Sequence, residues 1–321
     1  MTLETPTVLS GNGAQTHVPT NGLRTRPSGR VRRRRRWDPV GYLFIAPALL
    51  VYILFALTPV GETVWYSLFE WDGIGPSTWV GIQNYVHLFQ NDQIPSAVLH
   101  SCVLLIFYSW IPAAIGLVLA GMITRIRVRW LTGFRALLFL PQILSSVVVA
   151  VAWRGLFAYN GPVNAFLRLI GLGSLTRPWL GDFSTALPSV GVIGTWVEFG
   201  LCMMLFLAGA QRIPRELYEA ARIDGAGAVR EFLVVTVPSL RAEVRIVLLL
   251  TTIFALRNFD IIWNTTQGGP GSQTMVPSVY VYQDAFVSHQ VGAAAAFAVV
   301  LTLFILVVVS VVQSALRERR A

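Results

Sequence analysis

Residues 195–200, Thr-Trp-Val-Glu-Phe-Gly, place one carboxyl group between two aromatic side chains inside a long apolar run. Carboxyl oxygens accept hydrogen bonds from hydroxyl groups, and aromatic rings offer large apolar faces. Trp196, Glu198 and Phe199 thus have the chemistry to bind a hydroxyl-rich solute, and Gly200 would leave space for it. The alternative is that Glu198 is a buried structural charge, paired with an arginine of another chain.

A second polar group, Arg257-Asn258-Phe259-Asp260, lies at the end of another apolar run. Residues three apart share one face of a helix, so the spacing of Arg257 and Asp260 predicts an internal ion pair. Asn258 and Phe259 would point elsewhere and line a cavity. A charge inside a membrane span costs at least about 2.5 kcal/mol, which is why these residues and Glu198 are candidates for function.

The motifs of common enzymes are missing from the sequence. It has no phosphate-binding Walker A loop, no nucleophile elbow and no pair of histidines at helical metal spacing, and its two cysteines lie in apolar runs as expected for inert thiols. The Thr-Gln-Gly-Gly-Pro-Gly stretch at 266–271 is read as a turn. The 16 acidic residues are spread singly, which disfavours a membrane enzyme acting on lipid-linked sugar. A secondary transporter would show two inverted halves, and no internal repeat is evident.

Composition points to a membrane protein. Hydrophobic residues make up 54% of the 321 residues and charged residues 13%, with a mean hydropathy of +0.60, whereas soluble domains carry about 25% charged residues. A spanning helix needs about 20 apolar residues. Six windows qualify and predict an all-α protein with six transmembrane helices: 41–61, 97–123, 132–153, 188–210, 244–264 and 292–314.

The placement of arginine predicts the orientation. All 25 basic residues are arginine, and most lie before the first window, between windows two and three, between windows four and five, or at the C-terminus. The positive-inside rule therefore places both termini in the cytoplasm. Residues 1–37 are expected to be a disordered arginine-rich tail that lies against anionic lipid, with nucleic-acid binding as the weaker alternative. Residues 38–316 form the predicted membrane domain, and 317–321 a cytoplasmic end.

The loop at about 212–240 is the long charged stretch in the second half of the chain. Pro214 suits a helix start, and Arg-Glu-Leu-Tyr-Glu-Ala-Ala-Arg-Ile (215–223) predicts a helix. Asp224-Gly225-Ala226-Gly227 would end it, because both glycines can adopt positive φ. A second helical turn would then close at Pro238. By physics alone the loop is either a docking helix or an ordinary connector on the lipid surface.

The same loop resembles a known motif. Glu219-Ala220-Ala221, then Gly225 three residues later, then Val235, Val237 and Pro238 resemble the "EAA" loop of permease subunits of binding-protein-dependent ABC importers. The longer string 213–227 is similar to the carbohydrate branch, which includes maltose, glycerol-3-phosphate and multiple-sugar importers. Further similar stretches cover 80–89, 134–157, 161–172, 179–180 and 259–270, so the resemblance extends over about residues 38–316.

This resemblance implies a MetI-like permease fold in the bacterial plasma membrane. The chain would move a sugar or a similar solute, and would not itself be an enzyme. Its implied partners are a second permease, two ATP-binding subunits and an extracytoplasmic solute-binding protein. No cofactor would be bound directly, since ATP and magnesium belong to the ATPase. The implied docking residues for that ATPase are Glu219, Ala220, Ala221, Asp224, Gly225 and Pro238.

Overall fold

The computed structural model describes residues 39–125 and 131–316. The predicted tail 1–37 and the predicted end 317–321 lie outside the described residues. The chain divides into two units after Val51. The described part of the first unit belongs to helix α1 (Pro39–Tyr52), and the second unit holds all the other elements.

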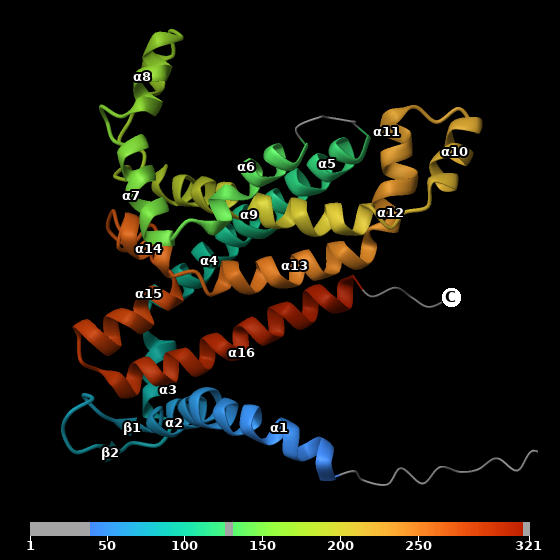
Figure 1. Ribbon diagram of the computed structural model, residues 1–321. Helices are drawn as coiled ribbons and strands as arrows, with labels where there is room; N and C mark the ends of the chain where they lie inside the picture. The colour runs from blue at the N-terminus through green and yellow to red at the C-terminus, as the bar shows by residue number, and fades with distance from the viewer. Residues whose placement is uncertain (1–38, 126–130, 317–321) are drawn as a thin grey trace, which may run out of the picture. The chain divides into compact units, whose positions relative to one another are not determined.

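The second unit is almost entirely helical (Figure 1). Its elements in chain order are α2 (Thr58–Tyr66), β1 (Phe69–Glu70), β2 (Thr78–Trp79), α3 (Gln83–Gln90), α4 (Gln93–Leu105), α5 (Ile111–Arg125), α6 (Leu131–Ile143), α7 (Ser146–Leu156), α8 (Pro162–Leu169), α9 (Ala186–Ala210), α10 (Arg215–Ile223), α11 (Ala228–Glu231), α12 (Val237–Ser239), α13 (Arg241–Leu256), α14 (Asp260–Thr265), α15 (Pro277–Tyr282) and α16 (Val291–Ala315). Short π-helical turns join neighbouring helices at η1 (Ile53–Leu57), η2 (Ile106–Trp110), η4 (Phe232–Thr236) and η5 (Gln283–Val287), and a 3-10 turn occupies η3 (Gly173–Leu175). The strands β1 and β2 form one antiparallel hairpin.

Four helices of the described chain are long and apolar enough to cross a membrane. They are Phe44–Tyr66, Gln93–Thr124, Ala186–Ala210 and Val291–Ala315. A fifth crossing is obtained if α6 and α7 count as one span, although they meet at a bend of 96°. The all-helical membrane class predicted from the sequence is thus observed.

Two of the six predicted windows are interrupted in the structure. In the window 132–153, the chain leaves the helix at Leu144 and Ser145, where Ser145 has extended backbone angles. In the window 244–264, α13 ends at Leu256 and α14 begins at Asp260. Hydropathy averaged over about 20 residues does not register these breaks, because the few polar residues at each break are averaged with long apolar stretches on both sides.

Helix α9 lies at the centre of the second unit, and α5, α6 and α13 all pack against it. Close packing depends on glycine. A side-chain carbon at Gly116 of α5 would lie 2.6 Å from the Met203 backbone nitrogen of α9. On α9 itself, Gly194 faces the ring of Tyr108, which occupies the space that a Cβ would need. Small residues at helix contacts let two backbones approach closely, as in many membrane bundles.

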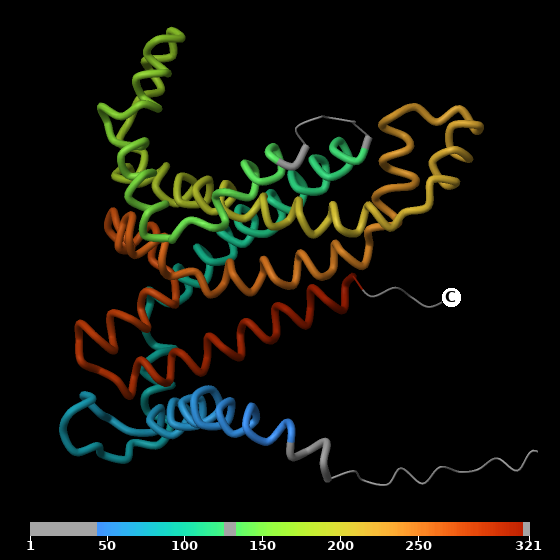
Figure 2. Tube along the Cα trace, viewed as in Figure 1, coloured from blue at the N-terminus to red at the C-terminus, as the bar shows by residue number. Residues whose placement is uncertain are grey.

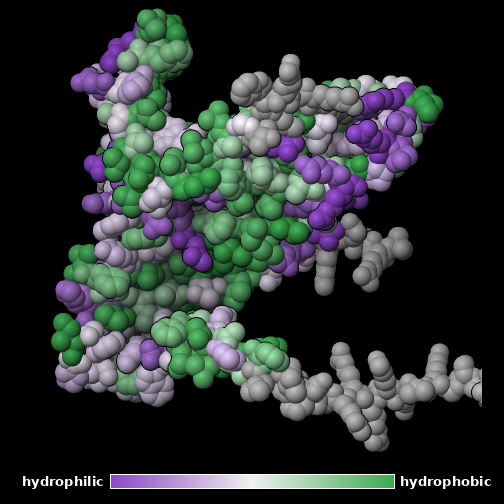
Figure 3. Space-filling model, viewed as in Figure 1, coloured by the Kyte–Doolittle hydropathy of each residue, from purple (hydrophilic) through white to green (hydrophobic). Residues whose placement is uncertain are grey.

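The connection between α9 and α13 forms a separate two-helix loop. Figure 2 shows the trace leaving α9, turning through α10 to α12 and returning into α13. Figure 3 shows hydrophilic surface gathered over α10, in contrast with the hydrophobic surface over the region of α9 and α13. The polarity of the surface therefore changes where the spans end and the loop begins.

Candidate functional site

The first candidate site is the acid inside α9. Glu198 is only 7% exposed, and its side chain forms no hydrogen bond or ion pair within the described residues. The Tyr108 hydroxyl of η2 donates weakly to the Val190 carbonyl at 3.4 Å. Both Glu198 and the side chain of Asn258 lie close enough to Tyr108 to interact with it. A buried acceptor without a partner is costly unless another group reaches it, so Glu198 has unused capacity to bind.

Asn258 and Glu198 come together although they are far apart in the sequence. Asn258 sits in the break between α13 and α14, where its backbone carbonyl accepts a hydrogen bond from the Ser278 hydroxyl. The sequence identified both residues, but only the fold shows that Tyr108 lies with them.

Polar contacts between spans surround this cluster. The Ser109 and Thr251 hydroxyls are 2.7 Å apart and join η2 to α13. The Thr195 hydroxyl of α9 donates to the Phe107 carbonyl of η2 at 2.6 Å. A π-helical turn leaves backbone carbonyls out of the regular ladder, and such turns occur often at functional sites. The cluster is therefore built around η2.

The aromatic residues near the two polar groups are half-buried. Trp196 meets Trp153 edge-on, with ring centroids 5.7 Å apart, while Phe199 is partly exposed on the same helix. Phe259 stacks on Trp263 at 5.7 Å and packs against Tyr282 at 4.9 Å. Trp263 and Tyr282 were not identified from the sequence. Trp263 could have been found from its spacing, because it lies four residues after Phe259 and would share one helix face with it.

Two expectations for this region are corrected. Gly200 does not leave space for a solute, because α6 fills that space: a Cβ there would lie 2.5 Å from the Leu138 carbonyl oxygen. Arg257 and Asp260 form no ion pair in the described chain, because Arg257 follows the end of α13 and Asp260 begins α14. Asp260 instead starts α14, where the helix dipole favours a carboxylate.

The second candidate site is the two-helix loop. The predicted helix 215–223 matches α10, which begins after Pro214 as its N-cap residue. Gly225 has φ of +77° and follows α10 in a Schellman motif. The Ala226 amide donates to the Ala221 carbonyl at 2.9 Å, and the Gly225 amide donates to the Arg222 carbonyl at 3.0 Å. The helix end thus requires glycine at position 225.

One other loop residue differs from expectation. Gly227 has φ of −75° and serves as the N-cap residue of α11, so it needs no left-handed backbone. The second helical segment runs from α11 through η4 into α12, which ends at Ser239. The expected end at Pro238 is therefore met to within one residue.

The outer face of α10 is open. None of its residues is buried, and Glu219, Ala220 and Asp224 are exposed. Ile223 is 86% exposed and Leu217 is 48% exposed on the same short helix. A small exposed surface that combines apolar side chains, alanines and a carboxylate is suited to contact another protein.

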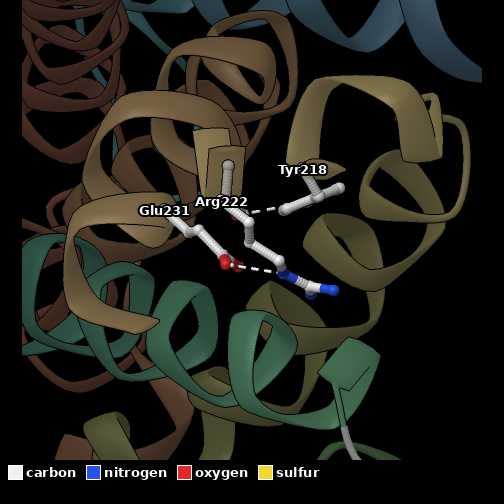
Figure 4. A network of polar contacts seen from close by, with 4 residues as sticks. Tyr218, Arg222 and Glu231 are labelled. Carbon is white, nitrogen blue, oxygen red and sulfur yellow. Dashed lines mark hydrogen bonds and ion pairs between the residues drawn. The ribbon is translucent and has the colours of Figure 1, made fainter. Parts of the chain in front are cut away.

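The inner face of α10 is tied to the second helix of the loop by side chains (Figure 4). The Arg222 Nε atom donates to Glu231 Oε1 at 2.8 Å. The hydroxyls of Tyr218 and Thr236 are 3.1 Å apart. The hydrogen bond to Glu231 raises the pKa of Arg222, because it stabilises the charged guanidinium. Tyr218, Glu231 and Thr236 were not identified from the sequence.

Spanning helices with a polar cluster among them and an exposed two-helix loop define a membrane transport subunit of the permease type. The chain belongs to the family of binding-protein-dependent transport system inner membrane components, whose pattern matches residues 113–321. It is 38% identical over 272 residues to the probable ABC transporter permease protein YurN of Bacillus subtilis (strain 168), covering 83% of this chain and 92% of that protein.

Two further similarities agree with this assignment. The diacetylchitobiose uptake system permease protein NgcF of Streptomyces coelicolor is 31% identical over 299 residues, covering 88% of this chain and 85% of that protein. The crystal structure of a bacterial alginate ABC transporter, in complex with alginate pentasaccharide-bound periplasmic protein, has the same fold. Its matching chain has a TM-score of 0.73 and 23% identity, covering 86% of this chain and 93% of that chain.

The family fixes the general role of the protein. The chain is the permease subunit of an ABC importer and a multi-pass protein of the inner membrane. It works with a solute-binding protein and is not an enzyme, since ATP hydrolysis resides on separate subunits.

Proposed function

We propose that the cargo is a carbohydrate, and that Glu198 and Asn258 bind its hydroxyl groups during passage. The main support for this proposal is the buried Glu198 carboxyl group, which has no partner among the described residues and lies beside Tyr108, as does Asn258. Two relatives named for saccharide transport support this cargo class.

Aromatic side chains complete the proposed path. Phe259, Trp263 and Tyr282 form a half-buried aromatic group, of which Phe259 follows Asn258 in the chain. Trp196 and Phe199 flank Glu198. Their ring faces provide apolar surface for the C–H faces of a sugar ring. Gly200 is left out of this path, because it forms part of the contact between α9 and α6.

We further propose that α10 docks on the ATP-binding subunits. Its exposed Glu219, Ala220 and Ile223 form the contact surface, and Gly225 fixes the end of the helix. Two ATP-binding subunits hold ATP and magnesium, and this chain binds neither. A second permease chain completes the membrane bundle. The arginine distribution supports a cytoplasmic position for α10 and both termini.

Purification from membranes tests the assembly. The full chain should recover an ATP-binding protein, a second permease and an extracytoplasmic binding protein, each identified by mass spectrometry. The binding protein, screened against a carbohydrate panel by thermal shift, should then identify the sugar. Recovery of the permease without an ATP-binding partner would contradict the proposed docking.

Uptake by the reconstituted complex tests the mechanism. Proteoliposomes that contain ATP should accumulate the sugar only when the binding protein is present, and vanadate should block uptake. Uptake that vanadate does not inhibit and that an ion gradient drives would contradict the proposal. Binding of only non-carbohydrate solutes by the binding protein would contradict the cargo class.

A further inference from the structure

The loop between α9 and α13 has an inner set of contacts that its docking face does not explain. Arg222 and Glu231 join α10 to α11 at 2.8 Å, and Tyr218 and Thr236 join α10 to η4 at 3.1 Å. The two ties lie one helical turn apart on α10, so they face the same side of the helix. Together they hold α10 against the second helical segment along its length (Figure 4).

Burial distinguishes the two sides of these ties. Glu231 is 4% exposed and Thr236 is 1% exposed, whereas α10 itself has no buried residue. The second segment is thus anchored in the protein, and α10 is held to it from outside. Because α10 buries no side chain of its own, the side-chain ties and the turn at Gly225 are its described connections to the anchored segment.

The anchored segment also contacts a membrane helix directly. Phe232 follows Glu231 in the chain, and its ring lies over Gly121 of α5, where a Cβ would be 2.5 Å from the ring. Helix α5 packs in turn against α9 at Gly116. A movement of the loop therefore has a direct path of packed groups into the central pair of spans.

We propose that Arg222–Glu231 and Tyr218–Thr236 make the loop a single rigid lever, which passes movement from α10 to α5 through Phe232. This proposal rests on the proposed docking of α10 to the ATP-binding subunits. Arg222, Glu231, Tyr218 and Thr236 act as positioning residues, since they contact neither solute nor ATP. Without the ties, α10 would turn about Gly225 and part of the movement would be lost within the loop.

The ratio of sugar imported to ATP hydrolysed is the quantity to measure, because loss of stability alone does not change it. The assembled importer in proteoliposomes carries Glu231→Gln, Arg222→Gln or both. Each single change should lower the ratio about fivefold, at the low end of measured coupling effects. The double change should lower it no further than Glu231→Gln alone, because Glu231→Gln already removes the contact that Arg222→Gln removes.

Matched variants control the experiment. Arg230→Gln removes an exposed arginine one position before Glu231 and should leave the ratio unchanged. Tyr218→Phe removes only the second tie and should lower the ratio by a smaller factor. Because Arg222 and Tyr218 lie on a helix without buried residues, their variants test the proposal even if Glu231→Gln fails to assemble.

The outcomes separate this proposal from the proposed docking. Intact assembly with an unchanged ratio in Arg222→Gln and Tyr218→Phe would overturn the lever. Equal losses from Arg230→Gln would also overturn it, since the effect would then be one of charge alone. Docking is tested by Ile223→Asp on the outer face: if the ATP-binding subunits still bind that variant normally, the docking proposal fails, whatever the ratio shows.

Discussion

The centre of the bundle and the loop between α9 and α13 each contain a nearly buried glutamate, but the two acids have different surroundings. Glu231 in the loop is 4% exposed and accepts a hydrogen bond from Arg222, whereas Glu198 in α9 is 7% exposed and forms no such contact within the described residues. The loop uses its acid to hold two helices together. The acid in the span has no such partner, which is the observation behind its proposed role in binding solute.

Glycine shows the same contrast. Gly194 in α9 has an ordinary helical backbone and is needed because the Tyr108 ring occupies the adjacent space. Gly225 in the loop has open space around it and is needed because φ is +77°. Packing against a neighbour therefore determines the residue in the span, while backbone conformation determines it in the loop.

Gly194→Ala should have the largest effect on stability. The added methyl group collides with the Tyr108 ring, and overpacking of a tight core typically costs about 1–3 kcal/mol. The measurement is thermal unfolding of the purified complex, compared with Gly155→Ala, where nothing lies within 4 Å. Equal melting temperatures for the two variants would show that the α9 contact with Tyr108 is loose.

Gly225→Ala should weaken the loop and leave the bundle intact. A left-handed backbone costs about 1–2 kcal/mol for a residue with a side chain. Amide exchange at Ala226, whose amide donates to Ala221, should therefore become faster. Gly227→Ala is the control, because φ is already negative there and the site is open. Equal exchange in both variants would remove the distinction between the two glycines.

Glu198→Gln should reduce transport with little change in stability. The amide replaces one of two acceptor oxygens by a donor, so a hydroxyl that donates to that oxygen loses a hydrogen bond of ~1 kcal/mol, or about fivefold in rate. The measurement is sugar uptake in proteoliposomes, with unfolding temperature as the control. Normal uptake and unchanged preference among sugars would assign Glu198 a structural role.

Ser109→Ala should have the smallest effect. It removes the 2.7 Å contact with Thr251 between η2 and α13, and hydrogen bonds between membrane helices average ~0.6 kcal/mol. A double-mutant cycle with Thr251→Val, followed by thermal unfolding, isolates this contact. A coupling energy of several kcal/mol would mean that η2 is held as rigidly as the contact at Gly194.

Much of the architecture could be predicted from composition and spacing. Long apolar runs identify spanning helices because backbone groups in lipid must be satisfied within the segment. The residues 215–223 and the glycine at 225 predict α10 and its end, because these signals are local. The 96° bend between α6 and α7 was not predicted, since the window 132–153 stays apolar on average across it.

The errors share one physical cause. The expected Arg257–Asp260 pair assumed one continuous helix, but the chain breaks between them. The expected space at Gly200 is filled by Leu138 of α6, which no spacing within α9 could indicate. The tie from Arg222 to Glu231 joins two helices across a turn, and the sequence shows two charges without showing that they meet.

The sequence by itself determined that the chain is a helical membrane protein, where its charged loop lies and where that loop turns. These properties depend on residues close together in the chain, through hydrophobic length and backbone preference. Only the tertiary structure decided which glycine fits a neighbour, which acid is paired and which is left available. Those properties depend on contacts between helices, which one helix alone does not specify.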